Sequence, residues 1–210
     1  MEVRVSPTRM ELLRLKRRIE LAERGHDLLE EKLEGLVKEF MPLIDEYVEL
    51  RDELDQKVPR ALSSFSRIAA EKGDESLKAA LGQTGFTASV EIWEERLANV
   101  PVPRFRARTE RALPHYSLLS TPPALDGAVN ELVELFALML KTCETEEAVR
   151  KLAKEIERTR RRVNALEYIF IPRLHEARKF IQYKLDEDER AAHIRSMKVK
   201  ELLEKAEARG

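Results

Sequence analysis

The sequence predicts a mainly α-helical protein: a long antiparallel two-helix coiled coil with a small inserted β-hairpin and a short helix. Charged residues make up 37% of the 210-residue chain and aromatic residues only 6%, with a net charge of -1, which is typical of long helices with one solvated face. Prolines and glycines gather in the middle third of the chain, and apolar residues recur every three or four positions on either side of it. We therefore divide the chain into an N-terminal long helix (1–58), an insert (59–125) and a C-terminal long helix (126–210).

The first long helix has a clear start and an uninterrupted apolar stripe. Thr8 follows Ser6-Pro7, and Glu11 comes three residues later, which is the spacing of a capping box. The stripe consists of Leu12, Leu15, Ile19, Ala22, His26, Leu29, Leu33, Leu36, Phe40, Leu43, Tyr47, Leu50 and Leu54. Alternating steps of three and four over about six heptads predict a left-handed coiled-coil seam. Pro42 lies inside this helix and is expected to kink it.

The second long helix carries a stripe that weakens and then recovers. Its predicted positions are Leu132, Leu135, Met139, the weak positions Thr142 and Glu146, and then Val149, Leu152, Ile156, Thr159, Val163, Leu166, Phe170, Leu174, Ala177, Ile181 and Leu185. Two consecutive steps of four, from Leu166 through Phe170 to Leu174, form a stutter that locally unwinds a supercoil. Because Pro172 lies inside this stutter, we expect a second bend there. The turns beyond Glu189 are expected to be helical but less firmly paired.

Charge suggests how the two helices pair. Residues 45–55 are mostly acidic and residues 150–162 are mostly basic. These blocks face each other in an antiparallel pair if the numbers of paired residues sum to about 204–212. The competing interpretation, that each block is simply a solvated helix face, is the more common case.

The insert combines a short helix with two β-compatible runs. Residues 74–81 predict the helix, which Gly82 ends. Apolar and polar residues alternate from Phe86 to Trp93, and a second run, 100–106, contains Pro101 and Pro103, so a β-hairpin is expected at about 86–107. Because an isolated two-stranded hairpin is marginal in water, it must lean on the helices or on a partner.

The sequence predicts no catalytic, cofactor-binding or metal-binding residues. It holds no glycine-rich phosphate loop, its histidines are scattered, and one cysteine cannot form an internal disulfide. His26 is expected to pack in the seam with its polar edge in water, and Cys143 to be a buried, unreactive thiol. The N-terminal residues show no apolar signal segment and no apolar run is long enough to span a membrane, so a cytoplasmic location without membrane insertion is expected.

Two segments of the chain resemble a known family. The run Val5-Ser6-Pro7-Thr8-Arg9-Met10-Glu11-Leu12-Leu13-Arg14-Leu15-Lys16 and the run His26-Asp27-Leu28-Leu29-Glu30-Glu31-Lys32 are similar to the D subunit of the archaeal and vacuolar (A-type/V-type) rotary ATPases. So are Thr159-Arg160-Arg161-Arg162-Val163-Asn164-Ala165-Leu166-Glu167-Tyr168 and Ile171-Pro172-Arg173-Leu174. The resemblance covers essentially the whole chain.

This resemblance implies a non-catalytic rotor shaft in the central stalk of the complex, peripheral to the membrane. The expected partners are the F subunit of the stalk, the A and B subunits of the catalytic head, and the C subunit (called d in eukaryotic enzymes), which is the socket on the membrane ring. The end that bears both termini would enter the head, and the shaft would carry torque between ion flow and ATP chemistry.

Candidate partner contacts are basic residues near the termini and aromatic residues of the insert. Residues 1–20 and residues 190–210 each hold six basic and three acidic side chains, a net charge of +3 per segment. Positive ends would be attracted by acidic loops of a surrounding ring. The candidate residues are Arg9, Arg14, Arg17, Arg18, Arg195, Lys198, Trp93 and Phe105. For the two aromatic residues, packing within the hairpin is an equally good interpretation.

The sequence gives less support to two other functions. A helical arm that binds nucleic acid is disfavoured by the near-zero net charge and a pI of about 6.5. A homodimeric parallel coiled-coil tether would favour an asparagine at a seam position, and Asn164 lies off the stripe. The mass of the isolated chain in light scattering would separate a hairpin from a dimer.

Overall fold

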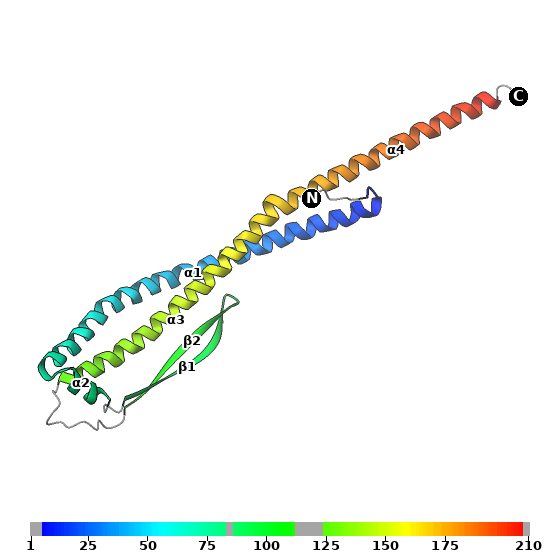
Figure 1. The fold of residues 1–210 in the computed structure, drawn as a ribbon. Helices are drawn as coiled ribbons and strands as arrows, with labels where there is room; N and C mark the ends of the chain where they lie inside the picture. Colours follow the sequence, from blue (N-terminus) through cyan, green and yellow to red (C-terminus); the bar gives the residue numbers. More distant parts are fainter. Residues whose placement is uncertain (1–5, 83–85, 112–123, 208–210) are drawn as a thin grey trace. The chain divides into compact units, whose positions relative to one another are not determined.

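The computed structural model describes residues 6–82, 86–111 and 124–207. Its elements are α1 (Arg9–Lys72), α2 (Asp74–Leu81), β1 (Phe86–Leu97), β2 (Val100–Arg111), α3 (Ala124–Ala165), the π-helical turn η1 (Leu166–Phe170) and α4 (Ile171–Glu207), shown in Figure 1. They confirm a mainly α fold with an inserted hairpin and a short helix. Two compact units contain them: a terminal unit of residues 1–33 and 158–210, and a central unit of residues 34–157.

Helix α1 starts as predicted and ends later than predicted. The side-chain oxygen of Thr8 accepts a hydrogen bond from the backbone N–H of Glu11 at 3.2 Å, which caps the first turn. The helix then continues through Pro59 to Lys72, although the sequence pattern placed its end at residue 58. It continues because the seam does: Ala61 and Ile68, at the same three-and-four spacing, are each 4% exposed. Gly73 follows with φ 84, a left-handed conformation that glycine adopts without strain.

One apolar cluster of the central unit forms where the insert meets α1 and α3. Its buried members are Ile68 of α1 and Leu125, Ala128 and Val129 of α3. Phe65 of α1 and Leu77, Ala80 and Leu81 of α2 pack against it. The short helix, whose predicted bounds of 74–81 are confirmed, is therefore held by its apolar face.

The seam on α3 follows the predicted positions only in part in its first half, where Leu135 and Thr142 are buried as predicted. Leu132 and Met139 were wrong choices, because their side chains are 46% and 44% exposed. Thr142, a predicted weak position, and Thr145, which was not predicted, are both buried, so the stripe does not weaken there. Each threonine hydroxyl donates to a backbone carbonyl of its own helix, Thr142 to Leu138 at 2.9 Å and Thr145 to Lys141 at 3.1 Å. A hydroxyl that makes such a hydrogen bond can be buried, so the polarity of threonine alone does not predict its exposure.

The predicted stutter coincides with the π-helical turn η1. The backbone N–H of Ile171 donates to the carbonyl of Leu166, five residues earlier. The next residue, Pro172, has no N–H to donate and would crowd the carbonyl four residues before it in a regular helix. The wider turn takes up one extra residue: Leu166 and Ile171 are half-buried, whereas Phe170, a predicted seam residue, is 50% exposed.

The pairing register of the helices differs from the one inferred from charge. In the central unit Lys141 pairs with Glu46 at 3.1 Å, and the hydroxyl of Ser64 contacts Glu131 at 3.3 Å. In the terminal unit Arg9 pairs with Glu189 at 2.5 Å. These pairs sum to 187, 195 and 198, so the window of 204–212 is wrong. The charge blocks misled because some of their members pair along their own helix, as Arg150 does with Glu146 and Glu147, and Glu46 pairs with Lys141, which lies outside the basic block.

The terminal unit consists of the first part of α1 packed against the end of α3 and α4. Its buried seam residues are Leu15, Ile19 and Ala22 on one side and Thr159, Val163 and Ile181 on the other. His175 contacts Glu23 across the pair at 3.3 Å. From residue 186 to residue 205, every side chain of α4 is exposed, which agrees with the expectation of a less firmly paired helix end.

The β-hairpin is present and regular. Twelve residue pairs run from Leu97↔Val100 to Phe86↔Arg111, so the ladder extends four residues beyond the predicted end at 107. Ala98 and Asn99 form a two-residue turn with φ 45 and 69, the left-handed pair that favours a tight hairpin. Val100 and Val102 are 8% and 1% exposed. Beside α3, the turn end thus packs into a cluster with Leu36 and Leu152 (Figure 1).

One carboxylate ties the second strand to α3. Glu144 accepts a hydrogen bond from the guanidinium of Arg104 at 2.5 Å and another from the backbone N–H of Phe105 at 2.7 Å. Arg104 also donates to Glu95 on the neighbouring strand at 2.5 Å. The hydrogen bond to Glu144, followed by that to Glu95, raises the pKa of Arg104 above its ordinary value. The predicted dependence of the hairpin on the helices therefore has a polar and an apolar component.

Leu152→Ala is expected to lower the free energy of unfolding by about 2–5 kcal/mol, because Leu152 is 0% exposed and its removal leaves a cavity in the seam. Leu62→Ala, at a position 61% exposed on α1, is the control and should change it by less than about 0.5 kcal/mol. Urea unfolding followed by circular dichroism measures both, and equal effects of the two changes would contradict the seam.

Glu144→Ala is expected to loosen the hairpin without unfolding the helices. Losing hydrogen bonds to a charged group should lower the free energy that protects the Phe105 amide by about 1.5–3 kcal/mol. Native-state hydrogen exchange reads this directly. Glu94→Ala, an exposed glutamate of the same hairpin, serves as the control, and unchanged protection in Glu144→Ala would show that the apolar cluster alone docks the strands.

Candidate partner-binding surfaces

The six basic candidates all lie in the terminal unit and all have exposed side chains. Two of them take part in ion pairs: Arg9 with Glu189 across the helix pair, and Arg14 with Glu11 at 3.5 Å along α1. Arg17 and Arg18 lie on exposed positions of α1, and Arg195 and Lys198 lie on the exposed end of α4. Ion pairs this exposed contribute little to stability, so these cations are accessible to a partner.

Large apolar side chains accompany the basic residues on the end of α4. Ile194, Met197 and Leu202 are 63%, 55% and 61% exposed. Further along the same unit, Tyr168, Ile169 and Phe170 of η1 are 70%, 51% and 50% exposed. Exposed apolar residues in such number make these two segments candidates for contact with other molecules.

The two aromatic candidates of the hairpin lie on opposite faces. Trp93 pairs with Arg104 and Phe105 pairs with Ile92, and consecutive residues of a strand point to opposite sides. The guanidinium of Arg106 lies 5.2 Å from the centre of the Trp93 ring, a cation–π contact on the face that also carries Val102. On the Phe105 face, Ile92 is 67% exposed. The pair is therefore not a single aromatic patch.

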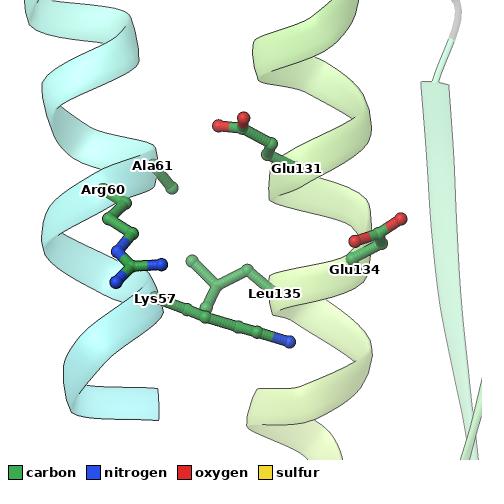
Figure 2. Close-up of a pocket in the computed structure, with 6 residues that line it drawn as sticks. All are labelled: Lys57, Arg60, Ala61, Glu131, Glu134 and Leu135. Atoms are coloured by element: carbon green, nitrogen blue, oxygen red, sulfur yellow. The ribbon is translucent and has the colours of Figure 1, made fainter. Parts of the chain in front are cut away.

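A cavity of about 180 Å³ lies between α1 and α3 in the central unit. Its floor is apolar, formed by Ala61 and by Leu135, which points from α3 toward α1 in Figure 2. Charged side chains of both signs surround it: Lys57 and Arg60 from α1, Glu131 and Glu134 from α3. The sequence pattern did not reveal it because the stripe of α1 was ended before Ala61.

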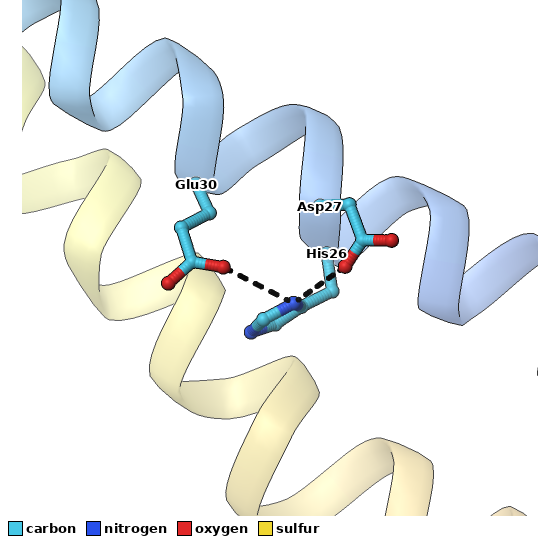
Figure 3. A group of neighbouring side chains, drawn as sticks. All are labelled: His26, Asp27 and Glu30. Atoms are coloured by element: carbon cyan, nitrogen blue, oxygen red, sulfur yellow. Dashed lines mark hydrogen bonds and ion pairs between the residues drawn. The ribbon is translucent and has the colours of Figure 1, made fainter.

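His26 lies between the two helices of the terminal unit, with two carboxylates at one ring nitrogen (Figure 3). Its Nδ1 is 3.3 Å from Oδ1 of Asp27 and 3.9 Å from Oε2 of Glu30, and its side chain is 17% exposed. The packing of His26 in the seam is as predicted, but Nε2 is buried without a hydrogen-bond partner among the described residues rather than solvated. The sequence does indicate this cluster, because His26 and Glu30 are four residues apart and therefore lie on the same face of a helix. A search for a second histidine overlooks it.

Cys143 is exposed, so the expectation of a buried thiol was wrong. The reason is the burial of Thr142 and Thr145: Cys143 follows Thr142 on the helix and therefore points away from the buried face. Within the described residues, no helix is both long enough and apolar enough to cross a membrane.

Comparison with known proteins gives a consistent result. Residues 11–201 match the family of the ATP synthase D subunit. The chain is 42% identical over 211 residues to the D subunit of the A-type ATP synthase of Thermococcus sibiricus, covering 99% of this chain and 98% of that protein. It is 41% identical over 205 residues to the D subunit of the V-type ATP synthase of Acetivibrio thermocellus, covering 96% and 92% of the two chains. To the A-type D subunit of Pyrococcus furiosus it is 40% identical over 209 residues, covering 98% of both chains.

The match spans most of the two long helical segments, the hairpin and the π-helical turn between α3 and α4, and of the surface residues named above only Arg9 and Leu202 lie outside it. The chain therefore belongs to the D-subunit family of the A-type and V-type ATP synthases.

Proposed function

We propose that this chain is the shaft of the central stalk, a non-catalytic component that carries torque between the catalytic head and the ion-translocating membrane ring. The observation that supports it most is the antiparallel seam, which holds two helices of one chain together within each unit. A single helix bends easily, whereas interlocked side chains resist bending and twisting of the pair. The shaft needs no catalytic group, because it would change the three nucleotide sites in turn by touching each differently.

The terminal unit is the part we expect the A and B subunits to surround. It contains both ends of the chain, and its exposed end of α4 combines basic residues with the exposed Ile194 and Met197. A positive surface would be attracted by acidic loops without a fixed register, which suits an element that must turn. The apolar side chains would supply contact area once the ring closes around them.

The central unit is the part we expect to meet the F subunit and the C subunit (d in eukaryotic enzymes). Its hairpin is anchored at the turn end, and the outer face with Ile92 and Phe105 offers apolar surface. The cavity beside Ala61 and Leu135 adds a charged rim to this unit. We further expect the assembled protein to be cytoplasmic and peripheral to the membrane.

The alternative functions receive less support. A homodimeric tether needs its seam for a second chain, yet Leu36 and Leu152 already bury each other within this chain. An arm that binds nucleic acid needs a net positive surface, and the chain carries a net charge of -1. Neither alternative explains the match to the ATP synthase family along both helices.

Reversing the charge of Arg14, Arg17 and Arg18 to glutamate is expected to reduce the coupling of ATP hydrolysis to ion transport severalfold in the reconstituted complex at low salt. The electrostatic attraction is screened at high salt, so the difference from the unmodified complex should shrink there. The matched control replaces the same three residues by lysine, which keeps the charge. Unchanged coupling of the glutamate variant at low salt would reject a role of these cations.

Rotation can be tested with a probe on Cys143, which is the chain's one cysteine and is exposed. A bead attached there in an immobilised complex should rotate in one direction during ATP hydrolysis, with three dwell positions per turn. A complex with the same bead on the catalytic head is the control and should show none. A stationary bead on Cys143 in a complex that hydrolyses ATP would exclude the shaft role.

A further inference from the structure

We propose that His26, Asp27 and Glu30 form a binding site for a divalent transition-metal ion such as Zn²⁺ or Mn²⁺ on the terminal unit. The three residues lie within five positions of α1, and one possible ligand atom from each lies within 4.8 Å of the others. They offer one imidazole nitrogen and two carboxylate oxygens. The inference does not depend on the rotor function, because it concerns the isolated chain.

The spacing of the donor atoms fits a metal ion. The nitrogen–oxygen distances are 3.3 Å to Asp27 and 3.9 Å to Glu30. Ligand bonds of about 2.0–2.2 Å place neighbouring donors about 3–3.6 Å apart, and opposite ones about 4.2 Å apart. Only small side-chain rotations would bring the three atoms onto one ion, and the helical backbone that carries them need not move.

The electrostatics of the group also favour a cation. Two carboxylates lie beside the same ring nitrogen, and like charges this close repel each other. The next acidic residue along this face, Glu23, is already engaged by His175 at 3.3 Å. Arg24 pairs with Glu20 at 2.6 Å, which leaves its charge directed along the helix away from Glu30. A divalent ion would neutralise the two carboxylates where they meet.

Burial prepares the imidazole for this role. The His26 side chain is 17% exposed, so packing against the neighbouring helix restricts its rotamers, while Asp27 and Glu30 remain 73% and 56% exposed. The ring therefore fixes one ligand, and the carboxylates can adjust and leave room for water on the remaining positions. This is the arrangement of a site with a few protein ligands and open coordination positions.

The donor set determines which ion binds. The imidazole suits Zn²⁺ and the two carboxylates suit Mn²⁺, whereas Mg²⁺ and Ca²⁺ prefer oxygen ligands alone. With the ion on Nδ1, the proton of the ring sits on Nε2, which has no hydrogen-bond partner among the described residues. A missing partner of this kind typically weakens metal affinity by about 10–100-fold, so we expect a dissociation constant on the order of micromolar rather than nanomolar.

The test is a titration of the full chain with Zn²⁺ by calorimetry and with Mn²⁺ by electron spin resonance. One ion per chain is expected, with no competition from about 1 mM Mg²⁺ or Ca²⁺, which is the upper end of the range over which oxygen-only Ca²⁺ sites fill. Glu30→Gln and Asp27→Asn should each weaken binding at least tenfold, and His26→Ala should abolish it. Glu31→Gln, an exposed acidic neighbour, is the matched control and should bind like the unmodified chain.

The two carboxylate variants keep the test decisive if His26→Ala loses structure, because both side chains are exposed and each variant is nearly isosteric. Circular dichroism of every variant checks that the helices remain. Equal binding in the control and in Glu30→Gln, several weak ions per chain, or an adventitious ion that none of the variants displaces would each overturn the proposal. So would the absence of binding at 1 mM Zn²⁺.

Discussion

The fold rests on a narrow apolar stripe that two segments of one chain must share. Within each unit, the buried positions of the long helices follow three-and-four spacing, and large apolar residues just beside them, such as Leu21 and Leu28, are 73% and 66% exposed. The free energy from burial is therefore concentrated in a few side chains, among them Leu36, Leu152 and Ile181, each at most 1% exposed. A narrow seam aligns two helices firmly and leaves most of their surface available to partners.

Two deviations from a simple seam show how strongly the pairing constrains the helices. Buried threonines replace apolar residues in α3, and their hydroxyls are satisfied by carbonyls one turn earlier on the same helix. Near Pro172, where a regular helix would lose a hydrogen bond, the chain inserts a π-helical turn and restores the stripe at Ile171. In both places the backbone or the side chain adjusts locally, and the buried stripe continues.

Much of the fold could be predicted from the sequence because periodicity reports burial directly. The stripe of α1, the hairpin and the position of the stutter follow from spacing, and the end of α2 follows from Gly82. What spacing could not give is the register, because exposed charges such as Arg51 pair along their own helix, here with Asp55 at 3.4 Å. Spacing also could not place Cys143 or the end of α1. Cys143 is exposed because the neighbouring Thr142 is buried, and α1 continues past Pro59 because Ala61 is buried.

The two faces of the hairpin differ in what they contact. Sequence alternation predicted two faces, and the side of Val100 and Val102 is the one that packs against the helices. The contact lies at the turn end, where Glu144 binds both a side chain and a backbone group of the second strand. A backbone contact fixes the position of the strand itself, whereas a contact through side chains alone would allow it to slide. The anchored turn end therefore also fixes the position of the rest of the ladder, where Ile92 is exposed.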